Sequence, residues 1–379
     1  MIAMANHDSH LTPLLRMRSR LAGIVWPPLV RGDLSELANT FELLDKTQWL
    51  SAPEIAEQQA VQLQAVVAHA ARHSLHFQQR LAAADLQASQ IVSLDDLRRL
   101  PVLTRSELNA AGASLFCREV PGMHQPVGTV QASGRTDQPR IVQRTYINHL
   151  YWMATTLRSH AWHHADFLGR FSAVRAAVAA PITFADWGTP INLLFDSGPS
   201  QVLPANFGAT QLLAELQAFA PSILSVYPSV LAALCARCEH SDHSRLKLVS
   251  IRTLGEVLPP ALRERAGILF GARLSDSYST EEVGSIATQC PVGELYHVSA
   301  ETVAVEILDA EGKPCSRGDI GRVVVTDLQN FATPLIRYAL GDYAEAGGPC
   351  PCGRGLPTLK RIHDRVSVLR VAPGCRDTL

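Results

Sequence analysis

The sequence has no excess of charge of either sign. It carries 34 Lys and Arg against 35 Asp and Glu, a formal net charge of −1, and charged residues make up only 18% of it. A chain with this balance has no global field that would recruit nucleic acid or an anionic membrane surface. We therefore expect a small molecule or a protein as partner, and no nucleic acid or membrane.

Long apolar runs are also missing, and no stretch approaches the ~20 apolar residues that a membrane-spanning helix needs. Arg16, Arg18 and Arg20 precede a short apolar run at 21–26, but Pro27 ends that run and no small-residue cleavage site follows. The eight cysteines are scattered, which fits a reducing compartment better than a disulfide framework. These features predict a cytoplasmic protein.

Aromatic residues are scarce, at 6%, yet hydrophobic residues reach 47% of the 379 positions. The chain can bury a large core and is too long for one compact unit. The first ~115 residues have helical patterns, and capping-box sequences at Ser51–Glu54 and Thr104–Glu107 predict two helix starts.

The middle and end of the chain have different rhythms. Between 171 and 285, apolar runs such as 223–227 and 248–251 alternate with helical stretches, which is typical of βαβ units and a mostly parallel sheet. After residue 298, alternating patterns joined by turn sequences predict a small antiparallel β part. The expected class is therefore α/β, with a helical N-terminal part and a small antiparallel β subdomain.

Three segments carry candidate nucleotide chemistry. The Gly/Ser/Thr-rich loop 132–139 can offer N–H groups and hydroxyls to phosphates, although a plain polar hairpin loop explains it as well. In segment 276–284, Tyr278 could pack on a base and Glu282 could hold Mg²⁺; a strand end with a solvated acidic turn is the alternative. In segment 338–342, Asp342 follows a glycine at a predicted strand end and could accept ribose hydroxyls.

In this order and at these separations, the three segments resemble the adenylate-forming superfamily of acyl-CoA synthetases, and within it the phenylacetate-CoA ligase-like branch. The resemblance covers about residues 40 to 370, and its most specific stretches are 278–284, 337–342 and 352–357. It implies a large adenylate-forming N-terminal domain. In that family a carboxylate attacks the α-phosphate of ATP, and the acyl-adenylate then passes its acyl group to a thiol, usually of coenzyme A.

The resemblance also implies roles for particular residues. The cofactor-binding residues would be Ser133, Gly134 and Thr136 of the phosphate loop, Tyr278 and Ser279 of the adenine motif, Asp342 at the ribose and Arg365 at the hinge. Glu282, as the Mg²⁺ ligand, and Thr136 would be the catalytic residues. The acid would lie among Tyr227, Gly255 and Glu256, with Trp187 or Phe184 as a wall.

Four residues have the composition of a closed structural zinc site. Six residues separate Cys290 from His297, and Cys350 and Cys352 follow later in a tight Cys-x-Cys. Three thiolates and one imidazole form a tetrahedral set with no open position, and the resembled branch often has cysteines here. The alternative is two buried thiols and a surface histidine. Cys235 and Cys238 fall in a helical run and are better explained as core or surface thiols than as metal ligands.

Two departures from the family pattern bear on activity. The phosphate loop has Ala132, Arg135 and Asp137 at positions where the family has Thr, Ser or Thr, and Gly, and a carboxylate at Asp137 would repel pyrophosphate. A C-terminal domain that brings the catalytic lysine would follow the hinge, but few residues remain there. We expect a helical part at 1–120, an α/β nucleotide- and acid-binding core at 121–285, an antiparallel β subdomain with the zinc site at 286–370, and a hinge remnant at 371–379 without the C-terminal domain.

The expected function is ATP-dependent adenylation of a small, aromatic carboxylic acid for transfer to CoA, a carrier protein or another acceptor. The expected cofactors are ATP, Mg²⁺, structural Zn²⁺ and CoA. Two alternatives stay open: a catalytically impaired homologue that binds a nucleotide or acyl-adenylate as a scaffold or regulator, and an acyltransferase that uses a pre-activated substrate. A partner protein that supplies the acceptor and a homodimer also stay open.

Overall fold

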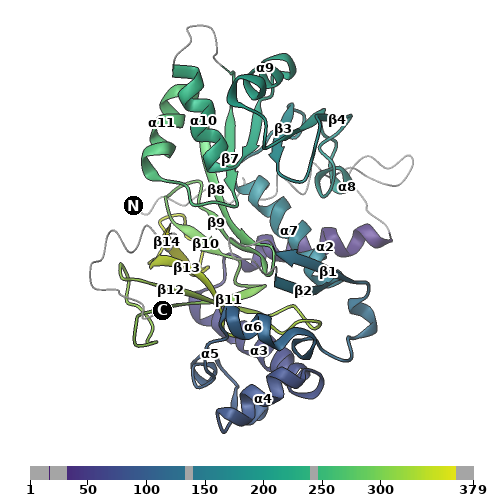
Figure 1. Cartoon of the computed structure of the whole chain (residues 1–379), viewed down its shortest axis with the longest axis vertical. Helices are drawn as coiled ribbons and strands as arrows, with labels where there is room; N and C mark the ends of the chain where they lie inside the picture. The colour runs from purple at the N-terminus through teal and green to yellow at the C-terminus, as the bar shows by residue number, and fades with distance from the viewer. Residues whose placement is uncertain (1–16, 18–31, 133–139, 240–245, 364–379) are drawn as a thin grey trace, which may run out of the picture. The chain divides into compact units, whose positions relative to one another are not determined.

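A computed structural model of the chain describes residues 17, 32–132, 140–239 and 246–363. The chain forms two compact units, and each is built from two separate segments. The first unit consists of Met1–Asp45 and Met153–Ser277, and the second consists of Lys46–Trp152 and Tyr278–Leu379. Figure 1 shows the elements of both units.

The first unit contains a mainly parallel sheet. Its strands occur in the order β8, β7, β6, β3, β5, β4; all neighbours are parallel except β4, which is antiparallel to β5. The strands are β3 (Phe171–Arg175), β4 (Ile182–Phe184), β5 (Ser200–Pro204), β6 (Ile223–Val226), β7 (Ser250–Leu254) and β8 (Arg273–Thr280), the last of which ends in the second unit.

Helices cover both faces of this sheet, one of which is apolar. On one face, Val174, Leu224 and Ile251 are buried in a core with apolar residues from α9, α10 and α11. On the other face, Arg252 of β7 contacts Ser159 of α7. The helices are α2 (Asp33–Thr47), α7 (Tyr146–Trp162), α8 (Ile191–Leu194), α9 (Ala209–Phe219), α10 (Pro228–Glu239) and α11 (Pro260–Phe270); α2 and α7 have one end in each unit.

The second unit contains antiparallel strands. Those after residue 283 occur in the order β9, β10, β14, β13, β12, β11, and a separate hairpin pairs β1 with β2. The strands are β1 (Val127–Ala132), β2 (Arg140–Thr145), β9 (Gly284–Gln289), β10 (Tyr296–Val298), β11 (Val303–Leu308), β12 (Ile320–Asp327), β13 (Tyr338–Ala346) and β14 (Thr358–His363).

The N-terminal helices of the second unit begin at the predicted caps. Ser51 and Glu54 form a reciprocal capping box at the start of α3, and Thr104 and Glu107 form another at the start of α6. Each box satisfies N–H groups that have no partner inside the helix. The helices are α3 (Ala52–His73), α4 (Leu75–Ala83), α5 (Leu94–Leu97) and α6 (Arg105–Ala111), with short 3₁₀ turns η2 (Ala88–Gln90), η3 (Gly112–Leu115) and η4 (Gly122–His124).

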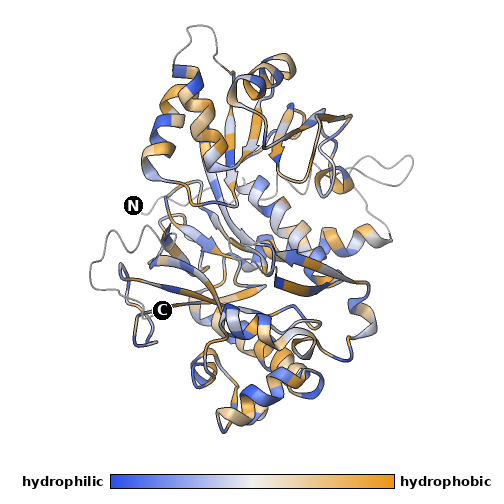
Figure 2. Cartoon of the chain, viewed as in Figure 1, coloured by the Kyte–Doolittle hydropathy of each residue, from blue (hydrophilic) through white to orange (hydrophobic). Residues whose placement is uncertain are grey.

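Apolar and polar residues alternate around α3, α4, α10 and α11, as expected of helices that bury one side (Figure 2). In the second unit, Leu63, Val66 and Phe77 of α3 and α4 pack with Leu328 and Ile336 in one buried cluster. The mixed α/β class, with parallel strands in the middle of the sequence and antiparallel strands after it, is thereby confirmed. No helix within the described ranges is both long and apolar enough to cross a membrane.

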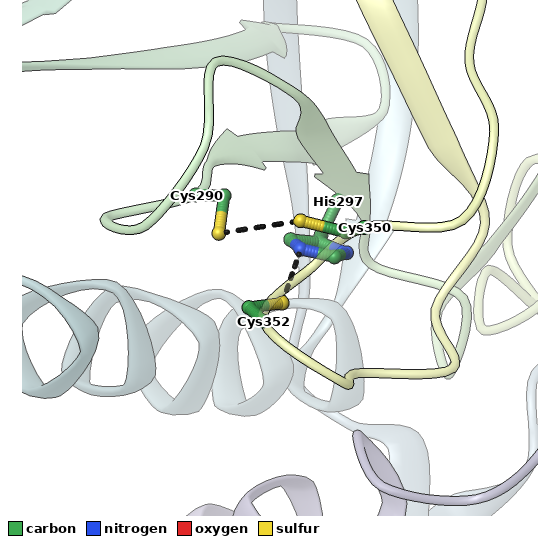
Figure 3. Close-up of side chains that lie close together, drawn as sticks. All are labelled: Cys290, His297, Cys350 and Cys352. Atoms are coloured by element: carbon green, nitrogen blue, oxygen red, sulfur yellow. Dashed lines mark hydrogen bonds between the residues drawn. The ribbon is translucent and has the colours of Figure 1, made fainter. Parts of the chain in front are cut away.

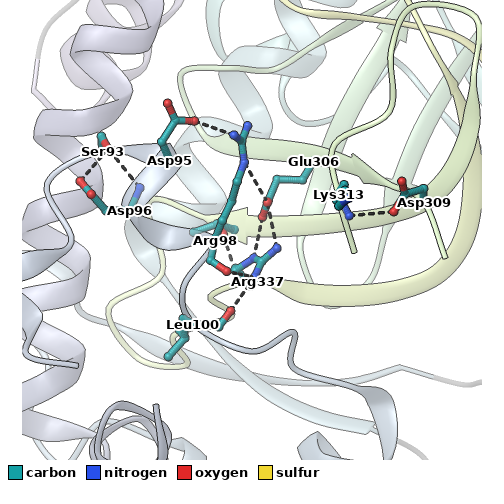
Figure 4. Close-up of polar contacts among 10 residues, drawn as sticks. Ser93, Asp95, Asp96, Arg98, Leu100, Glu306, Asp309, Lys313 and Arg337 are labelled. Atoms are coloured by element: carbon teal, nitrogen blue, oxygen red, sulfur yellow. Dashed lines mark hydrogen bonds and ion pairs between the residues drawn. The ribbon is translucent and has the colours of Figure 1, made fainter. Parts of the chain in front are cut away.

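A buried arginine joins the antiparallel strands to the helical part of the second unit (Figure 4). Arg337 donates two hydrogen bonds to the Glu306 carboxylate, of 2.9 and 3.0 Å, and two to the carbonyls of Arg98 and Leu100, of 2.9 and 2.5 Å. Its own backbone has φ of +53°, which side chains other than glycine rarely adopt. The contacts of its guanidinium compensate for that conformation and hold the start of β13 in place.

Asp327 at the end of β12 is a buried carboxyl with an incomplete set of partners. Its Oδ1 accepts a hydrogen bond from the Gln329 N–H at 2.9 Å, whereas Oδ2 is buried and has no partner among the described residues. Burial raises the pKa of Asp327 to about 6, against smaller opposing effects that include the charge of Arg144. The folded state therefore favours the protonated form of this carboxyl.

This shift predicts a pH dependence of stability. An aspartate whose pKa rises on folding stabilises the protein most when it is protonated, and that contribution is lost as pH rises from about 4 to about 6. Asp327→Asn removes the titration, so the free energy of unfolding of the variant should rise relative to the parent by about 3 kcal/mol across this range and then stay constant. Urea unfolding at a series of pH values measures the difference, and a difference that does not change with pH would contradict the assignment.

Candidate functional site

The second unit brings together two of the predicted nucleotide residues. Tyr278 near the end of β8 donates a hydrogen bond from its hydroxyl to Oδ2 of Asp342 on β13, at 2.9 Å. Tyr278 is buried, with 8% of its surface exposed, and Asp342 is half-buried. Burial first, and then the charge of Asp342, raises the pKa of the Tyr278 phenol well above its ordinary value, so the phenol stays a proton donor. Ser279 follows on the same strand and is half-buried.

The backbone before Asp342 is unusual. Gly341 has φ of +81°, and a Cβ at this position would lie 3.1 Å from the guanidinium carbon of Arg105, which donates to the Leu340 carbonyl. The positive φ therefore favours glycine here, and a side chain would also require the Arg105 guanidinium to shift. The predicted strand end at Asp342 is wrong: β13 continues to Ala346, and the left-handed glycine lies within the strand.

Glu282 lies just after β8, and its carboxylate is paired with an arginine side chain of the same unit. Arg140, at the start of β2, forms a short ion pair with the Glu282 carboxylate, and the Tyr338 hydroxyl lies 3.5 Å from the same oxygen. Arg140 is 5% exposed and Glu282 is 4% exposed, so both charges are withdrawn from water. Arg140 could not be recognised from the sequence, because it is 142 positions away from Glu282 and matches no motif. A buried carboxylate needs a counter-charge, so burial of Glu282 would have indicated a basic residue beside it.

Other predicted nucleotide residues fall where the structure gives no description. Ser133, Gly134 and Thr136, together with the altered positions Arg135 and Asp137, lie in the segment 133–139, outside the described residues. Arg365 and the expected hinge remnant 371–379 also lie outside them. Their roles stay predictions.

In the first unit, three predicted acid-binding residues lie close together after β6 and β7. Gly255 has φ of +77°, and its missing Cβ would lie 3.1 Å from the Tyr227 ring. Glu256 accepts hydrogen bonds from the N–H and the hydroxyl of Ser229, at 2.7 and 2.8 Å. Because Ser229 is in the first turn of α10, the Glu256 carboxylate caps the N-terminus of that helix.

Trp187 is buried in an aromatic group of the first unit. Its ring stacks on Phe171 of β3 with centroids 4.8 Å apart, and it lies 5.4 Å from Phe167 and 5.7 Å from His160. Its indole N–H donates to the Gly169 carbonyl at 2.9 Å. Phe184, the other predicted wall, is 49% exposed.

The four predicted zinc ligands form one cluster in the second unit (Figure 3). The donor atoms of Cys290, His297, Cys350 and Cys352 all lie within 4.8 Å of one another. The Cys350 and Cys290 sulfurs are 3.6 Å apart, and the Cys352 sulfur is 3.2 Å from Nε2 of His297. His297 is 1% exposed, so it is not a surface histidine as the alternative required.

The pKa shifts of the thiols in this cluster favour a thiolate at Cys352, and a thiolate is the form that binds a metal. Interaction with the Cys290 thiol, and then with His297, holds the pKa of Cys352 well below its ordinary value. The same pairing with Cys352, together with burial, raises the pKa of Cys290. Three sulfurs and one imidazole nitrogen at these separations are a donor set that fits Zn²⁺. In contrast, Cys235 and Cys238 are buried in α10, which decides between the core and surface positions that the sequence left open.

Comparison with known proteins finds no matching family model. The phenylacetate-coenzyme A ligase of Escherichia coli K12 is 24% identical over 314 residues, which cover 79% of this chain and 69% of the relative. The phenylacetate-coenzyme A ligase of Thermus thermophilus is 29% identical over 165 residues, which cover 40% of this chain and 36% of the relative. Among solved structures, 2-hydroxyisobutyryl-CoA ligase in complex with 2-HIB-AMP and CoA aligns with a TM-score of 0.67, 21% identity, and 84% and 76% coverage of the two chains.

The fold is that of the adenylate-forming CoA ligases. The sequence relatives agree with this fold, and over 79% of its length the chain is similar in sequence to a phenylacetate-coenzyme A ligase. The similarities support the expectation of an AMP-forming acid–CoA ligase.

A double-variant cycle tests whether Arg140 and Glu282 stabilise the fold through their interaction or independently of each other. Arg140→Met leaves Glu282 buried without a counter-charge, and Glu282→Gln leaves Arg140 in the same condition, so each should cost about 3–5 kcal/mol of unfolding free energy. The double variant should lose clearly less than the sum, because neither charge is then left alone. Urea unfolding measures all three variants.

The more exposed pair Arg265–Glu239 provides the control, since its side chains are 39% and 40% exposed and breaking such a pair should cost about 1 kcal/mol or less. Losses that simply add in the double variant would show that Arg140 and Glu282 do not stabilise one another.

Proposed function

We propose that this chain adenylates a small carboxylic acid with ATP and transfers the acyl group to a thiol, with CoA as the first acceptor to test. The observation that carries the proposal is the Tyr278–Asp342 hydrogen bond, which places an aromatic ring and a carboxylate of two adenylating motifs in contact. The sequence relatives are named phenylacetate-coenzyme A ligases, which supports an aromatic acid as substrate. A carrier or partner protein as acceptor, a homodimer and a cytoplasmic location stay predictions.

The chain's own groups suggest how nucleotide binding would work. The Tyr278 ring offers an aromatic edge for adenine, and its hydroxyl fixes the orientation of Asp342 by donating to one oxygen. An ionised, half-buried carboxylate held in this way is suited to accept hydrogen bonds from ribose hydroxyls. This arrangement positions the nucleotide before reaction and avoids the entropy cost of ordering the carboxylate later.

Mg²⁺ is expected from the superfamily and would neutralise phosphate charge when bound. Glu282, its predicted ligand, is bound to Arg140, so a metal there would need that buried pair to open. The described residues therefore do not offer a ready Mg²⁺ ligand at Glu282. The pair also favours a second candidate function, a homologue that binds a nucleotide or acyl-adenylate without turnover.

We also propose that Cys290, His297, Cys350 and Cys352 bind one structural zinc ion. The four donors close the tetrahedral set, so the metal would have a structural role and no open position for substrate. It would hold the segment that connects β9 to β10 against the segment between β13 and β14.

ATP–pyrophosphate exchange with a panel of aryl acids tests the ligase proposal. Exchange should be detectable with at least one acid, and Asp342→Asn should lower kcat/KM for ATP by about tenfold or more, because a charge-assisted hydrogen bond to ribose is lost. Asp309→Asn, in an exposed turn of the same unit, should leave it unchanged. ATP binding by calorimetry without any exchange would favour the binding homologue, and absence of both would overturn both candidates.

Metal analysis of the purified protein should find about one zinc per chain. Cys350→Ser and His297→Ala should each abolish zinc retention and lower the melting temperature, since the metal contributes to folding. Cys315→Ser, a cysteine outside the cluster, is the matched control. Protein that is free of zinc and melts at the same temperature with and without a chelator would exclude the site.

A further inference from the structure

Within the part of the chain that the structure describes, two arginines of the first unit have no carboxylate partner. Arg175 ends β3 and Arg252 lies within β7, and β6 with Ser225 runs between these strands. Among the described residues, neither arginine forms an ion pair. The buried arginines Arg140 and Arg337 of the second unit, in contrast, are each bound to a glutamate.

The strand register places these groups on one face of the sheet. Ala173 pairs with Ser225, and Ser225 pairs with Arg252. Because side chains alternate along a strand, Arg175 points to the same face as Ala173. This face is the one that α7 covers through Ser159, opposite to the apolar core.

The hydrogen bonds of the two guanidinium groups do not use all of their N–H donors. Arg175 donates to the Ser225 hydroxyl at 2.8 Å, to the Ser225 carbonyl at 3.3 Å and to the Val174 carbonyl at 2.9 Å. Arg252 donates from Nη2 to the Ser159 hydroxyl at 2.8 Å, whereas its Nη1 is buried and has no partner among the described residues. All of these acceptors are neutral.

Two partly buried positive charges without a negative one among the described residues are unfavourable. Burial, and then the charge of Arg175, lowers the pKa of Arg252 to about 10. Arg175 is affected mainly by burial, with a small opposing effect of Tyr227. An arginine stays protonated at this pKa, so the protein keeps both charges, and an anion that reached them would gain strong, charge-assisted hydrogen bonds.

The position of the pair indicates which anion reaches it. Arg175 ends its strand, and Tyr227 and Gly255 follow directly after β6 and β7, so all three lie toward the carboxyl ends of parallel strands. Ligands of open α/β sheets bind at that edge. The Tyr227 hydroxyl lies 3.5 Å from the Ala176 N–H, next to Arg175, which connects the pair to the predicted acid-binding residues.

The carboxylate that attacks ATP is a poor candidate for this place. An oxygen that accepts charge-assisted hydrogen bonds from two guanidinium groups holds its lone pairs tightly and is a weaker nucleophile. A carboxylate that stays unreacted gains from the same contacts without this penalty. The geometry therefore suits a recognition group of the substrate better than its reacting group.

We propose that Arg175, Arg252 and Ser225 form an anion site that binds a second acidic group of the carboxylic acid substrate, so that the preferred substrate is a dicarboxylic acid. This inference rests on the proposed function for the identity of the ligand, and it extends that function by the substrate class. The aromatic ring expected of the substrate is compatible with it, since an aryl dicarboxylic acid carries both features.

The test compares dicarboxylic acids with their half-amides, which have the same shape and one charge less. Calorimetry without ATP measures binding of 4-carboxyphenylacetate, glutarate and the corresponding half-amides to the full chain. At least one diacid should bind about tenfold or more tightly than its half-amide. Arg252→Met and Arg175→Met should each reduce this ratio to about one, and Arg265→Met, an exposed arginine of α11 that pairs with Glu239, should leave it unchanged.

Stability supplies a readout that does not depend on the choice of acid. Arg252→Met removes a withdrawn charge that lacks a counter-ion, so without ligand the variant should melt at or above the temperature of the parent. Arg252→Lys should keep part of the diacid preference. Diacid and half-amide ratios near one in the parent would overturn the proposal, as would an unchanged ratio in folded Arg252→Met.

Failure of this proposal and failure of the proposed function are distinguishable. Exchange with monocarboxylic acids alone, with no effect of Arg252→Met on kcat/KM, would leave the ligase function standing and overturn the anion site. Selective diacid binding that depends on Arg252, in a protein that catalyses no exchange with any acid, would support the anion site and overturn the ligase function.

Discussion

The ion pair between Arg337 and Glu306 is the constraint on which the nucleotide residues of the second unit depend. The Arg337 guanidinium donates hydrogen bonds to the Glu306 carboxylate of β11 and to two carbonyls of the helical part. The backbone N–H of Arg337 donates to the Thr326 hydroxyl of β12. These contacts fix where β13 begins, four residues before Asp342. Arginine suits this place because its five donors have a rigid planar arrangement that an ammonium group lacks.

Most of the architecture followed from local sequence signals. The boxes at Ser51 and Thr104 marked helix starts correctly, because a cap depends on residues three positions apart. The alternation of apolar runs with helical stretches predicted the parallel strands, because this pattern is also read from residues close together in the sequence. Local signals did not show that Lys46–Trp152 and Tyr278–Leu379 form one unit, since that grouping depends on contacts between distant segments.

The candidate sites also divide into those that a sequence pattern predicts and those that only the contacts between distant residues reveal. Cys290, His297, Cys350 and Cys352 could be proposed as one set because only a few chemistries combine thiols with an imidazole, and the structure places them together. Arg140 and Arg252 were missed, since a single arginine in a sequence has no distinguishing pattern. Their meaning comes from their surroundings: one has a buried carboxylate beside it, and the other does not.

Gly341 shows how a backbone requirement can keep a motif recognisable. The residue is exposed, and exposed positions usually accept many substitutions with small effects. Here φ of +81° strains any side chain, and the Arg105 guanidinium, 3.1 Å from the place of a Cβ, would have to shift to admit one. A mutational scan would thus record a surface position with the intolerance of a core residue. Over evolutionary time such a glycine would persist beside Asp342 even in descendants that no longer used the aspartate.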